Sequence, residues 1–116
     1  MAGQTQLTVI NLDRPRIMRF DLDALDMLEE LTGAKNFDEI VAVMKSFGGL
    51  RRAAYCALLQ DAKEHGETLT LDNVGDILRH ADYIDDIIDK VAEAVGSCFR
   101  PDEKEGAEQA DEAPKN

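Results

Sequence analysis

The stretch that decides the fold is Leu50-Arg51-Arg52-Ala53-Ala54-Tyr55-Cys56-Ala57-Leu58-Leu59. After its two arginines, it carries no charge until Asp61. Read as a helix, it places Leu50, Ala54, Ala57 and Leu58 on one face, and its other faces are also apolar or nearly so. A helix that is apolar most of the way round is normally buried. We therefore predict a central buried helix, whose alanines let other helices approach closely.

Amphipathic helices are predicted on both sides of this stretch. Apolar residues recur at helical spacing, and residues suited to capping helices begin or end each segment. Gly48 and Gly49 are expected to form the turn that precedes the central helix, and Gly66 is expected to end it. The other predicted helices run from Asp21 to Gly33, from Asn36 to about Met44, from Thr70 to about Ala81, and from Asp82, as the N-cap, to about Val95.

The two ends of the chain differ from this helical pattern. Leu7–Leu12 and Ile17–Phe20 read as short strands joined by the turn Asp13-Arg14-Pro15-Arg16, and such a hairpin is stable only if it packs on the helices. Residues 100–116 contain no apolar residue larger than Ala or Pro, which is typical of disorder. The expected fold is mainly α, with about five helices packed as one domain. That domain covers residues 1–99, with the N-terminal hairpin, and a disordered acidic tail covers residues 100–116.

Composition excludes several classes of function. The formal net charge of −11 argues against nucleic acid as a partner, because phosphates would be repelled. No apolar run approaches the length of a membrane span, and no signal peptide is apparent, so we expect a cytoplasmic protein without a membrane partner. Cys56 and Cys98 have neither CxxC spacing nor a histidine close by in sequence, and we interpret them as reduced thiols.

The last predicted helix carries the strongest amphipathic pattern. Ile84, Ile87, Ile88, Val91 and Val95 form its apolar stripe, and the opposite side is acidic. The acidic side is interpreted either as a solvated face or as a surface for basic groups of a partner. Arg51 and Arg52 are the other candidates for partner binding, although they could equally point to water or pair with surface acids. The candidate acidic residues are Asp82, Asp85, Asp86, Asp89 and Glu93.

No pattern in the sequence supports catalysis, a metal or a cofactor. The serines at predicted helix ends have no histidine beside them, so a nucleophile would lack its base. His65 and His80 lie near separate helix ends, and the acidic helix lacks the alternating ligands of a calcium loop. We therefore expect no enzyme activity and no cofactor.

The order of these segments resembles the tail assembly chaperones of long-tailed bacteriophages, prophages and gene transfer agents. The resemblance covers about Leu7 to Phe99 and is carried by the order and spacing of its pieces. One departure from the family is the hairpin turn at Asp13–Arg16, where relatives often have a glycine. The pieces that carry the resemblance are the acidic helix Phe20–Gly33, the Ala/Leu-rich Gly48–Leu59 and the segment Leu69–Leu78.

The resemblance implies a non-enzymatic protein that binds the tape measure protein and keeps it soluble in the host cytoplasm while the tail assembles. Such chaperones are generally absent from the finished particle. The tail tube protein and further copies of the chain are additional partners to test. The alternative is a small acidic helical adaptor or regulator that binds another cytosolic protein.

The family also often makes a longer product by programmed ribosomal frameshifting. The chain ends Pro114-Lys115-Asn116, which can be encoded with the slippery heptamer A AAA AAC in phase. An ordinary polar ending reads equally well, and only the gene sequence decides between them.

Overall fold

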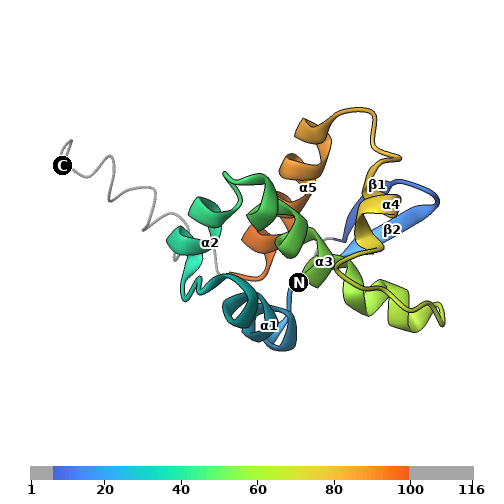
Figure 1. The fold of residues 1–116 in the computed structure, drawn as a ribbon. Coiled ribbons are helices and arrows are strands. Elements are labelled where there is room, and N and C mark those ends of the chain that lie inside the picture. The colour runs from blue at the N-terminus through green and yellow to red at the C-terminus, as the bar shows by residue number, and fades with distance from the viewer. Residues whose placement is uncertain (1–6, 100–116) are drawn as a thin grey trace.

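A long helix runs through the middle of the protein in the computed structural model, which describes residues 7–99 (Figure 1). This helix, α3 (Phe47–Glu64), contacts α1 (Leu22–Thr32), α4 (Val74–Leu78), α5 (Ile84–Ser97) and strand β2 (Pro15–Met18). Its residues Ala53, Ala54, Ala57 and Leu58 are fully buried. The predicted central buried helix is confirmed, and with α2 (Phe37–Val43) the described residues form five helices, as expected for a mainly α fold.

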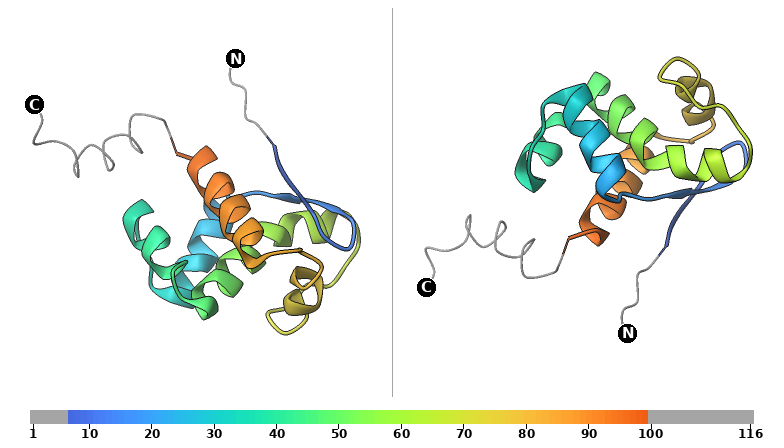
Figure 2. Two further views of the ribbon diagram at one scale, coloured as in Figure 1. Left: turned by 90° about the horizontal axis from the view of Figure 1, so that it is seen from above. Right: turned by 90° about the horizontal axis from the view of Figure 1, so that it is seen from below.

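The N-terminal hairpin is also confirmed, although its turn is tighter than predicted. Strand β1 (Thr8–Asn11) pairs antiparallel with β2, so that Asn11 lies opposite Pro15. A proline can begin a strand because the ladder needs no donor there. The Arg19 N–H donates to the Ala57 carbonyl at 2.9 Å, which attaches the chain to α3 directly after β2. The hairpin contacts α3 through β2 and α5 through β1 (Figure 2).

Four helix termini follow the predicted chemistry. Asp21 accepts a hydrogen bond from the Ala24 N–H, and Asn36 accepts one from the Glu39 N–H, each at 2.9 Å. Gly33 ends α1 with a φ of 83°, a left-handed conformation in which glycine carries no steric cost. Gly66 adopts a φ of 71° just after α3. These caps supply partners for backbone groups that a helix leaves unpaired at its ends.

The predicted turn at Gly48 and Gly49 is wrong. Both glycines lie inside the first turn of α3, and Ser46 is the N-cap, with its hydroxyl accepting a hydrogen bond from the Gly49 N–H at 3.0 Å. A Cβ atom on Gly49 would stand 1.8 Å from the Val43 carbonyl oxygen. Glycine is therefore needed here for the close approach of the end of α2, rather than for a turn.

The last two helices begin later than predicted. Thr70 and Asn73 exchange backbone-to-side-chain hydrogen bonds of 2.8 and 3.0 Å, and only Val74–Leu78 forms helix α4. Asp82 does not cap α5, because Tyr83 occupies the N-cap position without a side-chain hydrogen bond. The chain is already extended at Tyr83, which moves the first helical residue to Ile84.

Within residues 7–99, no helix is long and apolar enough to cross a membrane. The largest fully buried side chains come from four helices and the hairpin: Leu28, Leu58, Val74, Val91, Val95, Thr8 and Cys56. Among the described residues, Cys56 and Cys98 form no disulfide. The predicted disordered tail, residues 100–116, lies outside the described residues.

Candidate functional site

The acidic side of α5 lies on the surface, as the sequence pattern predicted. The acidic residues predicted on this side lie in different surroundings. Asp82, Asp86 and Asp89 line a hollow of about 350 Å³ between α5 and β1, together with Lys90. Glu93 is further along the helix, where it accepts a hydrogen bond from the Thr8 hydroxyl at 3.3 Å. Asp85 is exposed and does not line this hollow.

Among the described residues, no group of three or more histidine, cysteine or acidic side chains is placed to hold a metal ion. An acidic helix face that stays solvated needs no ligand to explain it.

Arg51 and Arg52 point to different surroundings. The Arg51 guanidinium donates to the Leu71 carbonyl and lies against Gly75 of α4, where an added Cβ would be 2.9 Å from Nη2. Arg52 donates to the Gly48 carbonyl of its own helix at 3.0 Å. Neither interaction involves a carboxylate. Arg51 therefore joins α3 to α4, whereas Arg52 stays on the surface of α3.

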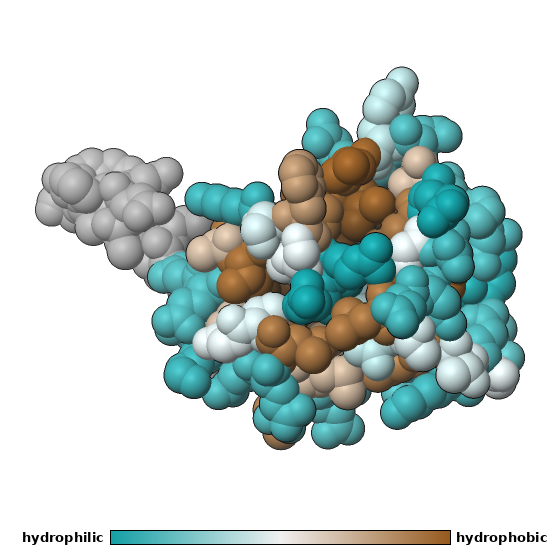
Figure 3. Space-filling model, viewed as in Figure 1, coloured by the Kyte–Doolittle hydropathy of each residue, from teal (hydrophilic) through white to brown (hydrophobic). Residues whose placement is uncertain are grey.

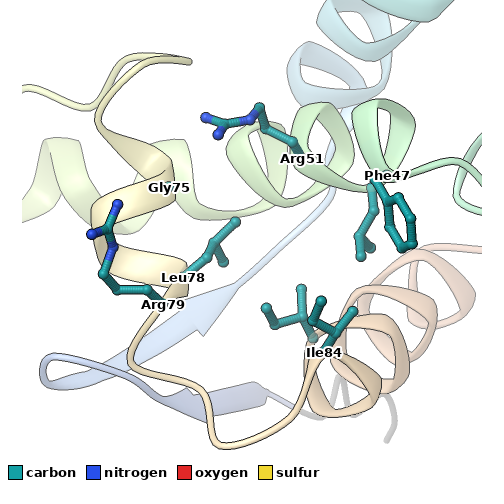
Figure 4. Close-up of a pocket in the computed structure, with 8 residues that line it drawn as sticks. Phe47, Arg51, Gly75, Leu78, Arg79 and Ile84 are labelled. Carbon is teal, nitrogen blue, oxygen red and sulfur yellow. The ribbon is translucent and has the colours of Figure 1, made fainter.

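Arg51 also lines an open apolar hollow that the sequence did not predict. The hollow has a volume of about 510 Å³ and lies where the first turns of α3 and α5 meet α4 (Figure 4). Phe47 comes from α3, Leu78 from α4 and Ile84 from α5, and Arg79 directly follows α4 as its C-cap. The full lining is Phe47, Leu50, Arg51, Gly75, Leu78, Arg79, Ile84 and Ile87.

A second apolar hollow of about 290 Å³ lies beside the first, because Phe47 and Leu50 line both. We call the two hollows together the Phe47 groove. The Phe47 side chain is 79 % exposed and Ile84 is 55 % exposed. On the face of the molecule seen in Figure 3, apolar surface lies between hydrophilic side chains. The second hollow is lined by Val41, Met44, Lys45, Phe47, Leu50, Ile88 and Ala92.

The charged groups of the Phe47 groove are all cationic. Lys45, Arg51 and Arg79 line it, and the described lining contains no carboxylate. Arg79 forms an exposed ion pair with Asp76 at 3.1 Å, just outside the lining. In a chain with 24 acidic and 13 basic residues, this local charge is the reverse of the overall charge.

The sequence pattern does not indicate this groove, because Phe47 lies directly before the two glycines for which a turn is predicted. Phe47 precedes two glycines, and the pattern gave no reason to place it on a helix beside α5. Ile84 belongs to the apolar stripe predicted for the last helix, and the structure leaves it half exposed. A signal was present in Ser46, which is a favourable N-cap and would have placed Phe47 at the first helical position.

A cluster of charged side chains joins the hairpin to the end of α3. We call it the hairpin clamp. Arg14 Nη2 donates to Asp61 Oδ2 at 2.7 Å, and Arg16 Nη1 donates to Glu67 Oε1 at 2.9 Å. Arg16 also binds both carboxylate oxygens of Asp13, at 2.7 and 2.8 Å. Arg16 and Asp61 are almost completely buried. The members are Asp13, Arg14, Arg16, Asp61 and Glu67.

The electrostatics of the hairpin clamp are those of a structural link. Hydrogen bonding to Arg16 lowers the pKa of Asp13 from 3.8 to about 2, and hydrogen bonding to Arg14 lowers the pKa of Glu67. Both carboxylates are therefore held in the charged form, whereas a general acid or base needs a pKa near neutrality. Burial raises the pKa of the Cys56 thiol to about 12, so that the thiol stays protonated near pH 7.

Comparisons with protein-family models, curated proteins and solved structures gave no match to this chain or its fold.

Proposed function

We propose that this protein is a non-enzymatic tail assembly chaperone, of the kind found in long-tailed bacteriophages, prophages and gene transfer agents. It would bind the tape measure protein and keep it soluble in the bacterial cytoplasm until tail-tube subunits polymerise around it. The finished particle would not contain it. The order of the segments Phe20–Gly33, Gly48–Leu59 and Leu69–Leu78 supports this assignment.

The observation that carries the proposal is an exposed apolar groove on a strongly acidic protein. A chaperone needs a surface that covers apolar residues of its client, and the exposed apolar lining of the Phe47 groove supports this role. It also needs to keep loaded complexes apart, and a net charge of −11 supplies mutual repulsion. The exposed carboxylates of α5 add to that repulsion without binding the client.

The test is co-expression with a long, helix-rich tape measure protein, which the proposal expects a neighbouring gene to encode. We expect the tape measure protein to be soluble and to co-purify with this chain. A helical protein of similar size and net charge serves as the control, and it should leave the client insoluble. If an intact client stays insoluble and unbound in both cases, the chaperone assignment is wrong.

Failure of this test would favour the adaptor, which has the exposed acidic side of α5 as its contact surface. Charge reversal at Asp85, Asp86 and Asp89 would then abolish binding to a basic cytosolic partner. Under the chaperone proposal, the same reversal leaves client binding in place. A longer frameshifted product remains part of the proposal, and sequencing the codons for Pro114–Asn116 and the overlapping frame tests it.

A further inference from the structure

We propose that the Phe47 groove binds the apolar face of an amphipathic helix whose flanking residues are carboxylates. The inference deepens the proposed function and rests on it, because it specifies which segments of a helical client the chaperone would hold. The client would bind in the groove between α3, α4 and α5, and not on the acidic side of α5.

The form of the groove favours a helix over an extended segment. Its walls are formed by helices, and the described lining contains no strand. An extended peptide would find no sheet edge in the groove with which to pair its own backbone. A helix arrives with its backbone already satisfied and needs only apolar contact. Side chains from successive turns could enter the hollows on both sides of Phe47.

The charges around the groove select the flanking residues of that helix. Lys45, Arg51 and Arg79 line it without an opposing carboxylate in the described lining. The Arg79 side chain is 73 % exposed, and its pair with Asp76 leaves further N–H donors for a second carboxylate. A guanidinium binds carboxylates through two parallel hydrogen bonds, which lysine cannot do.

Two other occupants fit less well. The acidic segment 102–116 of the same chain contains no apolar residue larger than Ala or Pro, and so it cannot fill apolar hollows. A second copy could offer the apolar stripe of its α5, but Ile87 and Val91 of that stripe are already buried in its own core. An external helix that has not yet packed elsewhere is the better occupant.

The test compares two stapled helical peptides of about 20 residues, a length at which a helix is stable enough to study. Both carry leucines at positions i, i+3, i+4 and i+7, and the flanking residues are glutamates in one and lysines in the other. Overall charge predicts that the acidic protein prefers the lysine peptide. The groove predicts that it prefers the glutamate peptide, by about tenfold at moderate salt. Preference for the lysine peptide would overturn the inference.

Surface variants place the binding in the groove. Phe47→Gln and Ile84→Gln are expected to weaken binding of the glutamate peptide by about tenfold or more, because they remove apolar anchors. Arg79→Glu is expected to reverse the preference between the peptides. The matched controls are Leu22→Gln, since Leu22 is 80 % exposed on α1, and Lys35→Glu, since Lys35 is 69 % exposed and paired with Glu29. Equal effects of variants and controls would exclude the groove.

The same variants separate this inference from the proposed function. Co-expression could solubilise the tape measure protein while Phe47→Gln, Ile84→Gln and Arg79→Glu leave the soluble fraction of that protein unchanged. The chaperone proposal would then be supported, and the assignment of client binding to the groove would be wrong. If the groove binds the glutamate peptide but the tape measure protein stays insoluble, the protein is a helix-binding module of another kind. If the protein alone is a dimer in solution and Phe47→Gln and Ile84→Gln convert it to a monomer, a second copy occupies the groove and the inference is overturned.

Discussion

Gly49 shows how much one missing side chain matters to the packing of α2 against α3. It is buried, and a Cβ atom there would stand 1.8 Å from the Val43 carbonyl oxygen and 2.9 Å from Ser46 Oγ. We expect Gly49→Ala to lower the free energy of unfolding by about 2–3 kcal/mol, because backbone must move to admit the methyl group. Urea denaturation monitored by circular dichroism measures the change.

The neighbouring glycine provides the control. A Cβ on Gly48 would meet only Arg52 Nη1, at 3.1 Å, and that flexible side chain can move. We therefore expect Gly48→Ala to leave the free energy of unfolding unchanged or to raise it by up to about 1 kcal/mol, since alanine has the higher helix propensity. If the two substitutions had the same effect, close packing would not be the reason for Gly49.

The two glycines also mark a limit of sequence-based prediction. Asp21, Asn36 and Gly33 were assigned correctly, because caps depend on local backbone chemistry that a few neighbouring residues determine. Gly48 and Gly49 look the same in a turn as in a helix that touches another backbone. Only the position of the Val43 carbonyl, which is a tertiary contact, separates these possibilities.

At the scale of elements, the hairpin depends on the buried carboxylate of Asp61. Asp61 is only 4 % exposed, and it accepts the 2.7 Å hydrogen bond from Arg14. We expect Asp61→Asn to lower the free energy of unfolding by about 2–4 kcal/mol, because the neighbouring arginines lose a buried counter-charge. Glu64→Gln on the same helix is the control, since Glu64 is exposed and contacts only Gln60 among the interactions described for it. Equal melting temperatures for the two variants would contradict this role.

The hairpin clamp should also make the stability of the protein depend on pH in the acidic range. The pKa of Asp13 is lowered from 3.8 to about 2 in the folded protein. The stability that the charged Asp13 contributes is therefore fully present above pH 3.8 and is lost as the pH falls toward 2. Glu67, whose pKa is also lowered, acts in the same direction. We expect the stability difference between wild type and Asp13→Asn to shrink across this range, as measured by thermal unfolding. A constant difference would exclude the linkage.

The elements themselves were largely predictable, whereas their connections were not. The 3.6-residue periodicity indicated the helices, and the apolar surroundings of Ala54 and Leu58 indicated which one is central. Asp61 continues the buried face defined by Ala54 and Ala57, which is an unusual place for a charge. That position hinted at a buried partner, but no local rule links it to Arg14, which is 47 residues away.

At the scale of the whole molecule, the net charge and the Phe47 groove have opposite effects on self-association. The groove exposes Phe47 and Ile84, and a surface of this kind favours self-association. The net charge of −11 at pH 7 opposes it. The groove could not be predicted from the sequence, because it forms only where the first turns of α3 and α5 meet α4. The charge that balances it was apparent from composition alone.

This balance predicts how the isolated protein behaves as the pH approaches its isoelectric point of about 4.5. Net repulsion between molecules is lost there, while the pH is still above the range in which Asp13 loses its charge, so the ion pair between Asp13 and Arg16 is retained. We expect light scattering to rise near this pH and Phe47→Gln to reduce the rise, because the variant removes the most exposed large apolar side chain of the groove. Leu22→Gln, at an equally exposed leucine outside the groove, should have a smaller effect. Equal effects would mean that association follows total exposed apolar area, and the groove would then have no special part in it.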